Sequence, residues 1–181
     1  MDNKVVDWSY NSKIAEHINI VIIMEKVLKF FNSPWRIKFF YLTKLPTMWF
    51  YGVRVQSVTK ERSEVSIRLN WRTKNPFRSI YAGALFSAGE LTTGLLAFLP
   101  IAAEPQKVSM LCAAAEVEYI KKAVGKITYT CEDGAAILET VQKAKESDEG
   151  HTVRSTAIAK NEQGEVVARL SFVWTFKARK K

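Results

Sequence analysis

The chain has 181 residues, of which 48% are hydrophobic and 25% charged, with a formal net charge of +9. This length and balance exclude intrinsic disorder and favour one domain whose core needs no disulfide or metal. The positive charge suits nucleic acid, an anionic membrane or a phosphate-bearing small molecule, but no helix-turn-helix, zinc-finger or aromatic RNA-binding signature accompanies it, so we disfavour a nucleic-acid role.

The N-terminal residues and the cysteines bear on the cellular compartment. Residues 1–4 lack the basic n-region of a signal peptide, and the most apolar N-terminal stretch, Ile18 to Met24, is far shorter than the roughly 20 residues of a membrane span. Cys112 and Cys131 stand apart, without metal-ligand spacing. We therefore expect a cytoplasmic protein with no transmembrane segment, no metal and no cofactor of its own.

The first elements in chain order are helical. Amphipathic periodicity runs from about Lys13 to Phe31, and Ser33-Pro34 ends it. An aromatic-rich stretch, Trp35 to Tyr41, follows before Pro46 interrupts it. These basic, amphipathic elements could lie on a membrane surface. We expect them instead to form a helical extension, residues 1–48, that packs on the core and covers an edge or face of the main sheet.

From Phe50 onward the hydrophobic period changes to two, which predicts strands. The segments Tyr51 to Thr59 and Glu64 to Trp71 form a hairpin with a polar turn between them. A long segment with a single charge, Ile80 to Leu99, comes next, and its length favours a buried helix that stops at Pro100.

The remainder of the chain is predicted to be mostly strands. They cover Val108 to Tyr119, Lys126 to Glu132, His151 to Lys160 and Glu165 to Lys177, with a turn at residues 161–164 and a short helix or irregular crossing at Ala135 to Lys145. One helix followed by a meander of strands predicts an α+β domain, residues 49–181, with an antiparallel sheet wrapped around that helix. The other face of the helix must be covered by the N-terminal helix or by a second subunit, so we expect a homodimer or a homotetramer.

Glu90 is the only charged residue between Arg78 and Glu104. It lies in the middle of the predicted helix, so it is neither an N-cap nor a partner of the helix dipole in the first turn. Its helical stripe is made mostly of small residues: Gly83, Phe86, Ser87, Thr93, Gly94 and Ala97. The carboxylate is either structural, satisfied by Thr93 or by a cation at an interface, or a general base or nucleophile in an apolar cleft.

The start of the same helix offers a second candidate feature. The backbone N–H groups of Ala82 and Gly83 belong to the unpaired first turn, where they could point at a carbonyl oxygen that becomes an oxyanion. The missing Cβ of Gly83 would let a ligand approach, although close helix–strand packing explains a glycine equally well.

The run from Asn75 to Glu90 resembles the hot-dog thioesterases of the phenylacetate-degradation type. Those proteins carry an Asn, then a His-Gly-Gly that opens the central helix, then an Asp or Glu within it; Asn75, Tyr81-Ala82-Gly83 and Glu90 fall at matching spacings. The chain is also similar to a little-characterised bacterial branch of that superfamily in the sequence Asn-Trp-Arg-Thr-Lys-Asn at residues 70–75. The resemblance covers roughly Phe50 to Lys181 and implies a hot-dog fold and an acyl-CoA thioesterase.

The resemblance also implies roles for individual residues. Glu90 would be the base or nucleophile, the amides of Ala82 and Gly83 would polarise the thioester carbonyl, and Asn75 would position substrate or water, across a dimer interface. In relatives a hydroxyl on the strand after the helix often orients water. By spacing this is Ser109, whereas counting back from Tyr119 gives Cys112.

The substrate would be an acyl-CoA, with coenzyme A present only as part of it. Basic side chains are needed near its phosphates. The substrate-binding candidates are Tyr81, Arg78, Ser87, Ser109, Lys121 and Lys122.

Two departures from the family pattern bear on catalysis. Tyr81 replaces the usual His and can donate a hydrogen bond but cannot act as a base near neutral pH, and Ala82 replaces a glycine and could crowd the oxyanion hole. The alternative is therefore a non-catalytic acyl-thioester binding or sensing protein. A dehydratase or hydratase would pair a His with an acid, but His17 and His151 lie far from Glu90 in the sequence, so we disfavour this reaction.

Overall fold

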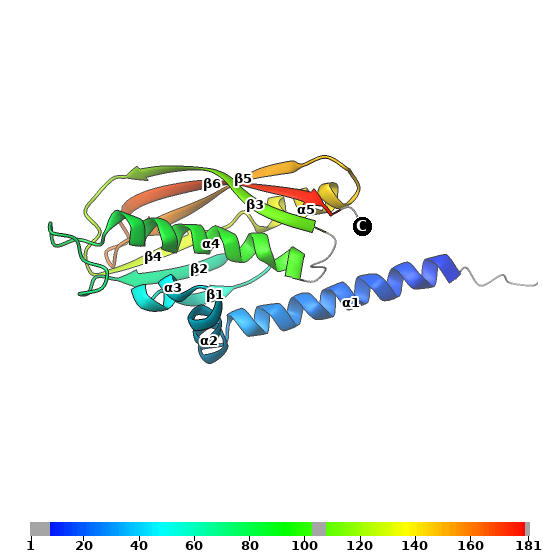
Figure 1. The fold of residues 1–181 in the computed structure, drawn as a ribbon, viewed down its shortest axis with the longest axis horizontal. Coiled ribbons are helices and arrows are strands. Elements are labelled where there is room, and N and C mark those ends of the chain that lie inside the picture. Colours follow the sequence, from blue (N-terminus) through cyan, green and yellow to red (C-terminus); the bar gives the residue numbers. More distant parts are fainter. Residues whose placement is uncertain (1–7, 103–107, 180–181) are drawn as a thin grey trace, which may run out of the picture.

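The computed structural model describes residues 8–102 and 108–179 of the chain. The helices are α1 (Trp8–Phe31), α2 (Pro34–Lys44), α3 (Pro46–Tyr51), α4 (Ala82–Ala102) and α5 (Gly134–Lys145). The strands are β1 (Arg54–Val58), β2 (Ser63–Arg68), β3 (Val108–Tyr119), β4 (Lys126–Cys131), β5 (His151–Lys160) and β6 (Val166–Ala178). In Figure 1 the sheet curves along α4, and α2 and α3 lie beside β1.

The six strands form one sheet in the order β1-β2-β4-β5-β6-β3, and every neighbouring pair is antiparallel. The predicted α+β hot-dog arrangement, a sheet around one long helix, is thereby confirmed. The expectation of a simple meander after α4 is wrong, because β3 pairs with β6 rather than with β4. The reason is that α4 carries the chain across the sheet, so β3 starts at the edge opposite β1.

Close packing between α4 and β6 explains one glycine of α4, Gly89, and β6 also lies against Gly94 of the small-residue stripe. A Cβ added at Gly89 would lie 2.8 Å from a methyl carbon of Leu170, and one at Gly94 would lie 3.5 Å from the Trp174 ring. The Trp174 indole N–H also donates to the Thr93 hydroxyl at 3.1 Å. What approaches the helix at these glycines is therefore its own sheet.

The helix α4 is long and apolar enough to cross a bilayer, judged by length and composition alone. In the structure 72% of the most apolar 18-residue stretch of α4 is buried inside the protein, so α4 is the core helix of the fold. It continues to Ala102, two residues past the predicted stop, with Pro100 in its last turn. A proline this close to a helix end removes few helical hydrogen bonds, so the helix tolerates it.

The helix α1 attaches to the core through one stripe of its surface. Met24, Leu28 and Phe31 are buried at helical spacing, and the Phe31 ring lies 6.2 Å from the ring of Phe98 on α4. Beyond Phe31, Asn32 joins the end of α1 to β1. The second half of α1, together with Asn32, therefore anchors this helix to the sheet domain.

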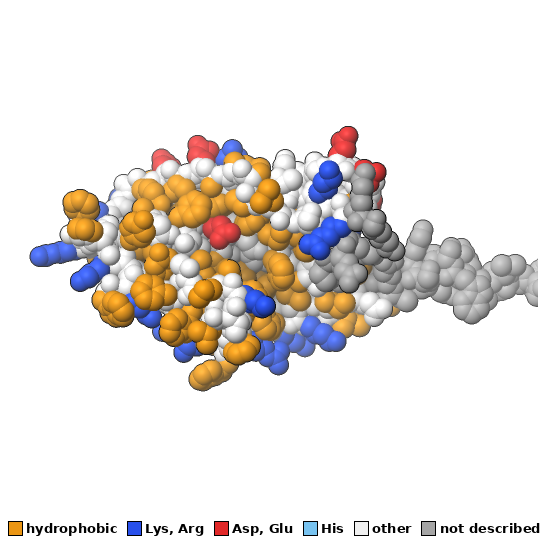
Figure 2. Space-filling view, in the orientation of Figure 1, with side chains coloured by type: hydrophobic (Ala, Val, Ile, Leu, Met, Phe, Trp, Pro, Cys, Tyr) orange, Lys and Arg blue, Asp and Glu red, His pale blue; other side chains and the backbone are white. Residues whose placement is uncertain are grey.

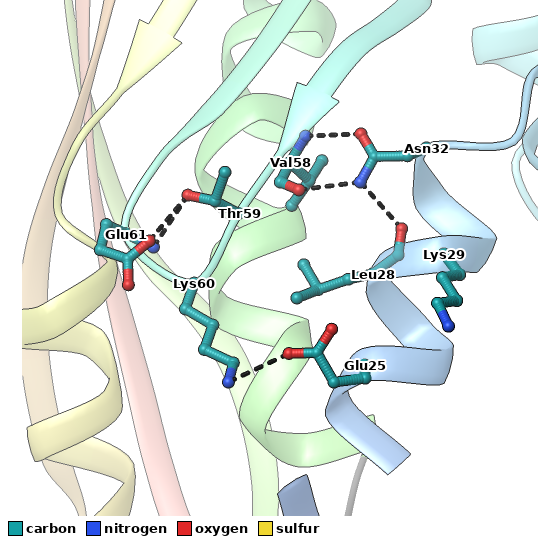
Figure 3. A pocket seen from close by; sticks show the side chains of 8 residues that line it. All are labelled: Glu25, Leu28, Lys29, Asn32, Val58, Thr59, Lys60 and Glu61. Carbon is teal, nitrogen blue, oxygen red and sulfur yellow. Dashed lines mark hydrogen bonds and ion pairs between the residues drawn. The ribbon is translucent and has the colours of Figure 1, made fainter. Parts of the chain in front are cut away.

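Asn32 makes this connection through three hydrogen bonds (Figure 3). Its carboxamide oxygen accepts the N–H of Val58 at 2.9 Å, and its amide nitrogen donates to the carbonyls of Val58 at 2.8 Å and Leu28 at 2.9 Å. Nearby, Lys60 pairs with Glu25 at 3.2 Å. The side chain therefore replaces a strand partner that β1 lacks at this edge of the sheet.

The segment after Pro46 differs from its prediction. Tyr51 was expected to begin the first strand, but residues 46–51 form α3 and β1 begins only at Arg54. Pro46 is the first residue of α3. A proline is tolerated there because the N–H of that residue has no helical acceptor. The same proline therefore separates α2 from α3 and begins the second of these helices. Gly52 then ends α3 with φ +69°.

Candidate active site

Glu90 lies two turns into α4 and is half-buried. Over the described residues, no hydrogen bond or ion pair involves its carboxylate. Burial raises the pKa of Glu90 above its ordinary value, because a charged group loses hydration inside the protein. Figure 2 shows many hydrophobic side chains on the face over α4, and Glu90 is the only acidic residue of that helix. Such a carboxylate is a stronger base than one in water.

Cys112 on β3 faces α4, because it pairs with Trp174 of β6, whose indole bonds Thr93 on that helix. The pKa of the Cys112 thiol is raised, first by burial and then by the charge of Glu90. Ser109 instead donates to the carbonyl of Lys177 at 3.1 Å. Of the two candidates for the strand position, the structure therefore places Cys112 toward Glu90.

A β-bulge in β3 is the reason why spacing alone left this choice open. The register with β6 shifts between Cys112 and Ala114, so one residue is added between two regular stretches of the strand. Counting from the start of β3 and counting back from its end therefore assign the same residue to opposite faces of the sheet.

The first turn of α4 leaves two backbone N–H groups without an acceptor. The N–H groups of Ala84 and Leu85 both donate to the carbonyl of Tyr81 at 3.0 Å. The N–H groups of Ala82 and Gly83 have no acceptor within the ranges that the structure covers. They are two adjacent free donors at the start of a long helix.

Two tyrosines frame this helix start. The Tyr81 ring lies on Gly83, since a Cβ added there would be 2.5 Å from a ring carbon of Tyr81. The Tyr119 hydroxyl donates to the carbonyl of Ala82 at 3.0 Å, and burial and Tyr81 both raise the pKa of Tyr119. Tyr119 was not among the predicted site residues. No local pattern marks it, because it reaches α4 only through the long return of β3.

Asn75 holds its own loop. Its side-chain oxygen accepts the N–H groups of Phe77 at 3.0 Å and Ser79 at 3.2 Å, and its amide donates to the Ser79 hydroxyl at 3.0 Å. This loop keeps Arg78 in a left-handed conformation with φ 60°. The structure thus gives Asn75 a positioning role for the residues that precede α4, and contact with a substrate remains a prediction.

The other predicted substrate contacts are spread around the helix start. Ser87 donates to the carbonyl of Gly83 at 2.8 Å within α4, and Lys121 pairs with Glu165 at 2.7 Å. Arg78 and Lys122 are exposed, and neither makes an ion pair with any residue in the described ranges. Both are available to an anionic ligand near this end of the helix. The described residues contain no cluster of three or more His, Cys, Asp or Glu side chains suited to a metal.

A separate groove lies between α1 and the turn from β1 to β2 (Figure 3). It is lined by Glu25, Leu28, Lys29, Asn32, Val58, Thr59, Lys60 and Glu61. None of the predicted site residues lines it, and its polar groups largely bind one another. We therefore assign the candidate site to the exposed side of α4, from Tyr81 to Glu90, with Cys112 and Tyr119 from β3.

Comparisons with known proteins identify a family and support the fold. A family model, the domain of unknown function DUF4442, matches residues 33–176. A search of curated proteins found no match to this chain.

Three solved structures illustrate the similarity in fold. A Pseudomonas aeruginosa protein described as a probable thioesterase is 19% identical with a TM-score of 0.62, over 81% of this chain and 97% of its own. A Haemophilus influenzae thioesterase is 10% identical with a TM-score of 0.60, over 81% of this chain and 91% of its own. A mutant of a Staphylococcus aureus thioesterase is 16% identical with a TM-score of 0.58, over 73% of this chain and 98% of its own. At these identities the similarity establishes a shared fold.

Proposed function

This chain belongs to the DUF4442 domain family, and we propose that it is a thioesterase that hydrolyses an acyl-CoA. The observation that carries the proposal is the state of Glu90: a half-buried carboxylate with a raised pKa and no partner in the described part of the chain. The fold is shared with proteins named thioesterases, which supports the same reaction class. A carboxylate in this state is suited to act as a base or a nucleophile.

The proposed reaction breaks the C–S bond of the thioester. Glu90 either removes a proton from the attacking water or attacks the carbonyl carbon itself, in which case water hydrolyses the resulting anhydride. The free N–H groups of Ala82 and Gly83 stabilise the carbonyl oxygen while it carries negative charge. The products are a carboxylic acid and the thiol of coenzyme A, which takes up a proton as it leaves.

We propose that a second copy of the chain completes this site. Glu90 comes seven positions after Gly83, which corresponds to about 10 Å of helix rise. A single thioester carbonyl needs both its oxyanion donors and its attacking group at contact distances of about 3 Å. Two α4 helices in antiparallel contact would place the start of one helix beside Glu90 of the other. This proposal explains why the site lies on the exposed side of α4.

The substitution Glu90→Gln tests the proposed chemistry. Turnover of a panel of acyl-CoA esters, measured by release of free thiol, is expected to fall by a factor on the order of 10² or more. The fold should persist because the amide has nearly the same volume. The matched control is Glu132→Gln, an exposed carboxylate after β4 that pairs with Arg62, and it should leave turnover unchanged. Hydrolysis that survives in Glu90→Gln contradicts the mechanism.

One observation favours acyl-thioester binding without turnover as a second candidate. The Tyr81 ring lies directly on Gly83 and takes space beside the donor that a carbonyl would need. In that case the wild-type protein binds acyl-CoA, measured by calorimetry, but releases no thiol, and Glu90→Gln changes the affinity alone.

A further inference from the structure

The helix α2 carries apolar side chains on two opposite faces. One face packs on the core through Ile37 and Tyr41, which are buried. The other face carries Trp35, Phe39 and Leu42, whose side chains are 82%, 69% and 53% exposed. Spacings of four and three residues place these three in a single outward stripe. Core packing does not explain this stripe, because it points away from the core.

This stripe is continuous with exposed aromatic residues on neighbouring elements. Trp49 and Phe50 at the end of α3 are exposed, and the Phe50 ring meets the Trp71 ring edge-on at 6.1 Å between centroids. Figure 2 shows hydrophobic side chains gathered over α2 and α3, with Lys and Arg side chains around them. We call the surface formed by Trp35, Phe39, Leu42, Trp49, Phe50 and Trp71 the aromatic surface. A continuous exposed patch of this kind is unusual on a protein that has no partner for it.

The charge around the aromatic surface has one sign. Residues 26–60 contain seven Lys or Arg and no Asp or Glu. Arg36 and Lys38 flank the α2 stripe on its two sides, and the Lys38 ammonium lies 5.8 Å from the centre of the Trp35 ring. The partner of this surface must therefore be both apolar and negatively charged.

We propose that the aromatic surface docks on an anionic lipid bilayer. Tryptophan and phenylalanine side chains enter the boundary between headgroups and acyl chains, and the flanking Lys and Arg side chains reach the lipid phosphates. The helix α2 has 11 residues between Pro34 and Lys44, too few to span a bilayer, so it lies in the plane of the membrane surface.

A second copy of the chain fits this surface less well than a bilayer does. A two-fold contact places the same patch on both sides, so Arg36 and Lys38 would face their own copies and repel them. An anionic bilayer supplies negative charge and an apolar interior together. The proposal does not depend on the chemistry at Glu90, which lies on α4.

The test is co-sedimentation of the full-length protein with lipid vesicles. Vesicles of phosphatidylcholine mixed with phosphatidylglycerol should bind the protein, vesicles of phosphatidylcholine alone should bind it much less, and added salt should weaken binding. The double substitution Trp35→Ala with Phe39→Ala should lower affinity at least about tenfold, because two apolar side chains no longer enter the lipid. Both side chains are exposed, so the melting temperature should stay close to that of the wild type.

Charge reversal gives a matched pair of variants. Arg36→Glu with Lys38→Glu should reduce binding by about fivefold or more per residue, the effect expected of a basic side chain at an anionic surface. Lys160→Glu with Lys177→Glu makes the same charge change at exposed positions on β5 and β6 and should reduce binding far less.

Three results overturn the proposal. The first is no binding to vesicles that contain phosphatidylglycerol. The second is an equal loss of binding in both charge-reversal variants, which means that net charge alone attracts the protein. The third is a change in sedimentation mass in the Trp35 and Phe39 variant without a change in lipid binding, which means that a second copy covers the surface.

Discussion

At the scale of single residues, the fold makes Glu90 harder to ionise. Burial removes water from its carboxylate, and no cation in the described part of the protein compensates. The raised pKa in the folded chain has a consequence for stability, because protonation then favours the folded state relative to the unfolded chain. The stabilisation is complete at pH values below the unfolded pKa and is lost as the pH rises through the folded pKa.

The pH dependence of stability in Glu90→Gln follows from this linkage. The variant cannot ionise, so its melting temperature should match that of the wild type in acid and exceed it as the pH rises through the pKa of Glu90 in the folded protein. Thermal unfolding measured at a series of pH values, with Glu132→Gln as the control, gives this difference directly. A difference that stays constant or reverses as the pH rises would show that the Glu90 charge is compensated in the folded protein.

A second residue-scale feature is the pair of tyrosines at the start of α4. The Tyr119 hydroxyl bonds the carbonyl of Ala82, and the Tyr81 ring lies on Gly83, so two aromatic rings flank the first turn. A histidine at position 81, as in the resembling family, would bring a base to this place, whereas Tyr81 brings only a hydrogen-bond donor. The chemistry proposed for Glu90 therefore proceeds without help from a base at the helix start.

At the scale of elements, α4 and β6 pack closely at one glycine and loosely at another. Gly89→Ala places a methyl group against the fully buried Leu170 and should destabilise the protein by about 1–3 kcal/mol. Gly94→Ala meets Trp174 at ordinary contact distance and should stabilise it by up to about 1 kcal/mol, because alanine favours a helix over glycine. Chemical denaturation of both variants measures the contrast. Equal effects would mean that backbone propensity, not packing, controls both sites.

The connection between α1 and β1 is also an element-scale feature. Asn32→Ala removes three hydrogen bonds and leaves the N–H and carbonyl of the buried Val58 without their partner, at a cost of about 1–3 kcal/mol in the free energy of unfolding. Thr43→Ala is a control, because the Thr43 hydroxyl donates only to carbonyls of α2 itself, at an exposed position. Equal stability of the two variants would show that water replaces the Asn32 bonds without loss.

At the scale of the whole molecule, the two edges of the sheet differ. β1 has five residues, contains a register shift and is contacted by α1 and α2. β3 has 12 residues, contains no Lys, Arg or Pro, and exposes Leu111 and residues 113–116. A long unpaired edge without lysine or proline is a surface for pairing with another strand. We expect β3 to pair with β3 of a second copy.

The substitution Ala115→Lys tests this assembly. Ala115 is exposed and lies opposite the buried Phe172 in the register of β3 and β6, so a lysine there would place a charge at the proposed contact. The wild type should sediment as a dimer or larger and the variant as a monomer with unchanged far-ultraviolet circular dichroism. Gln56→Lys puts the same charge on β1 at the opposite edge and should leave the mass unchanged. A monomeric wild type at micromolar concentration would contradict the expectation.

The sequence alone determined the identity and order of most elements. Alternating residues predicted β3 and β5 with the bounds that the structure has, and a long apolar run with a single charge predicted the core helix. Glu90 could be singled out because charge is scarce around it. These signals are local: the period of apolar residues records that a side chain is buried and which backbone geometry buries it.

Only the tertiary structure decided what each buried or exposed side chain meets. The pairing of β3 with β6, the approach of Cys112 to Glu90 and the return of Tyr119 to the start of α4 all join segments that are distant in the chain. A β-bulge changed the alternation in β3, and packing on the core assigned one apolar face of α2 to the interior and left the other outside. Periodicity cannot specify these contacts, because they depend on the order in which strands lie side by side and on the space left between layers.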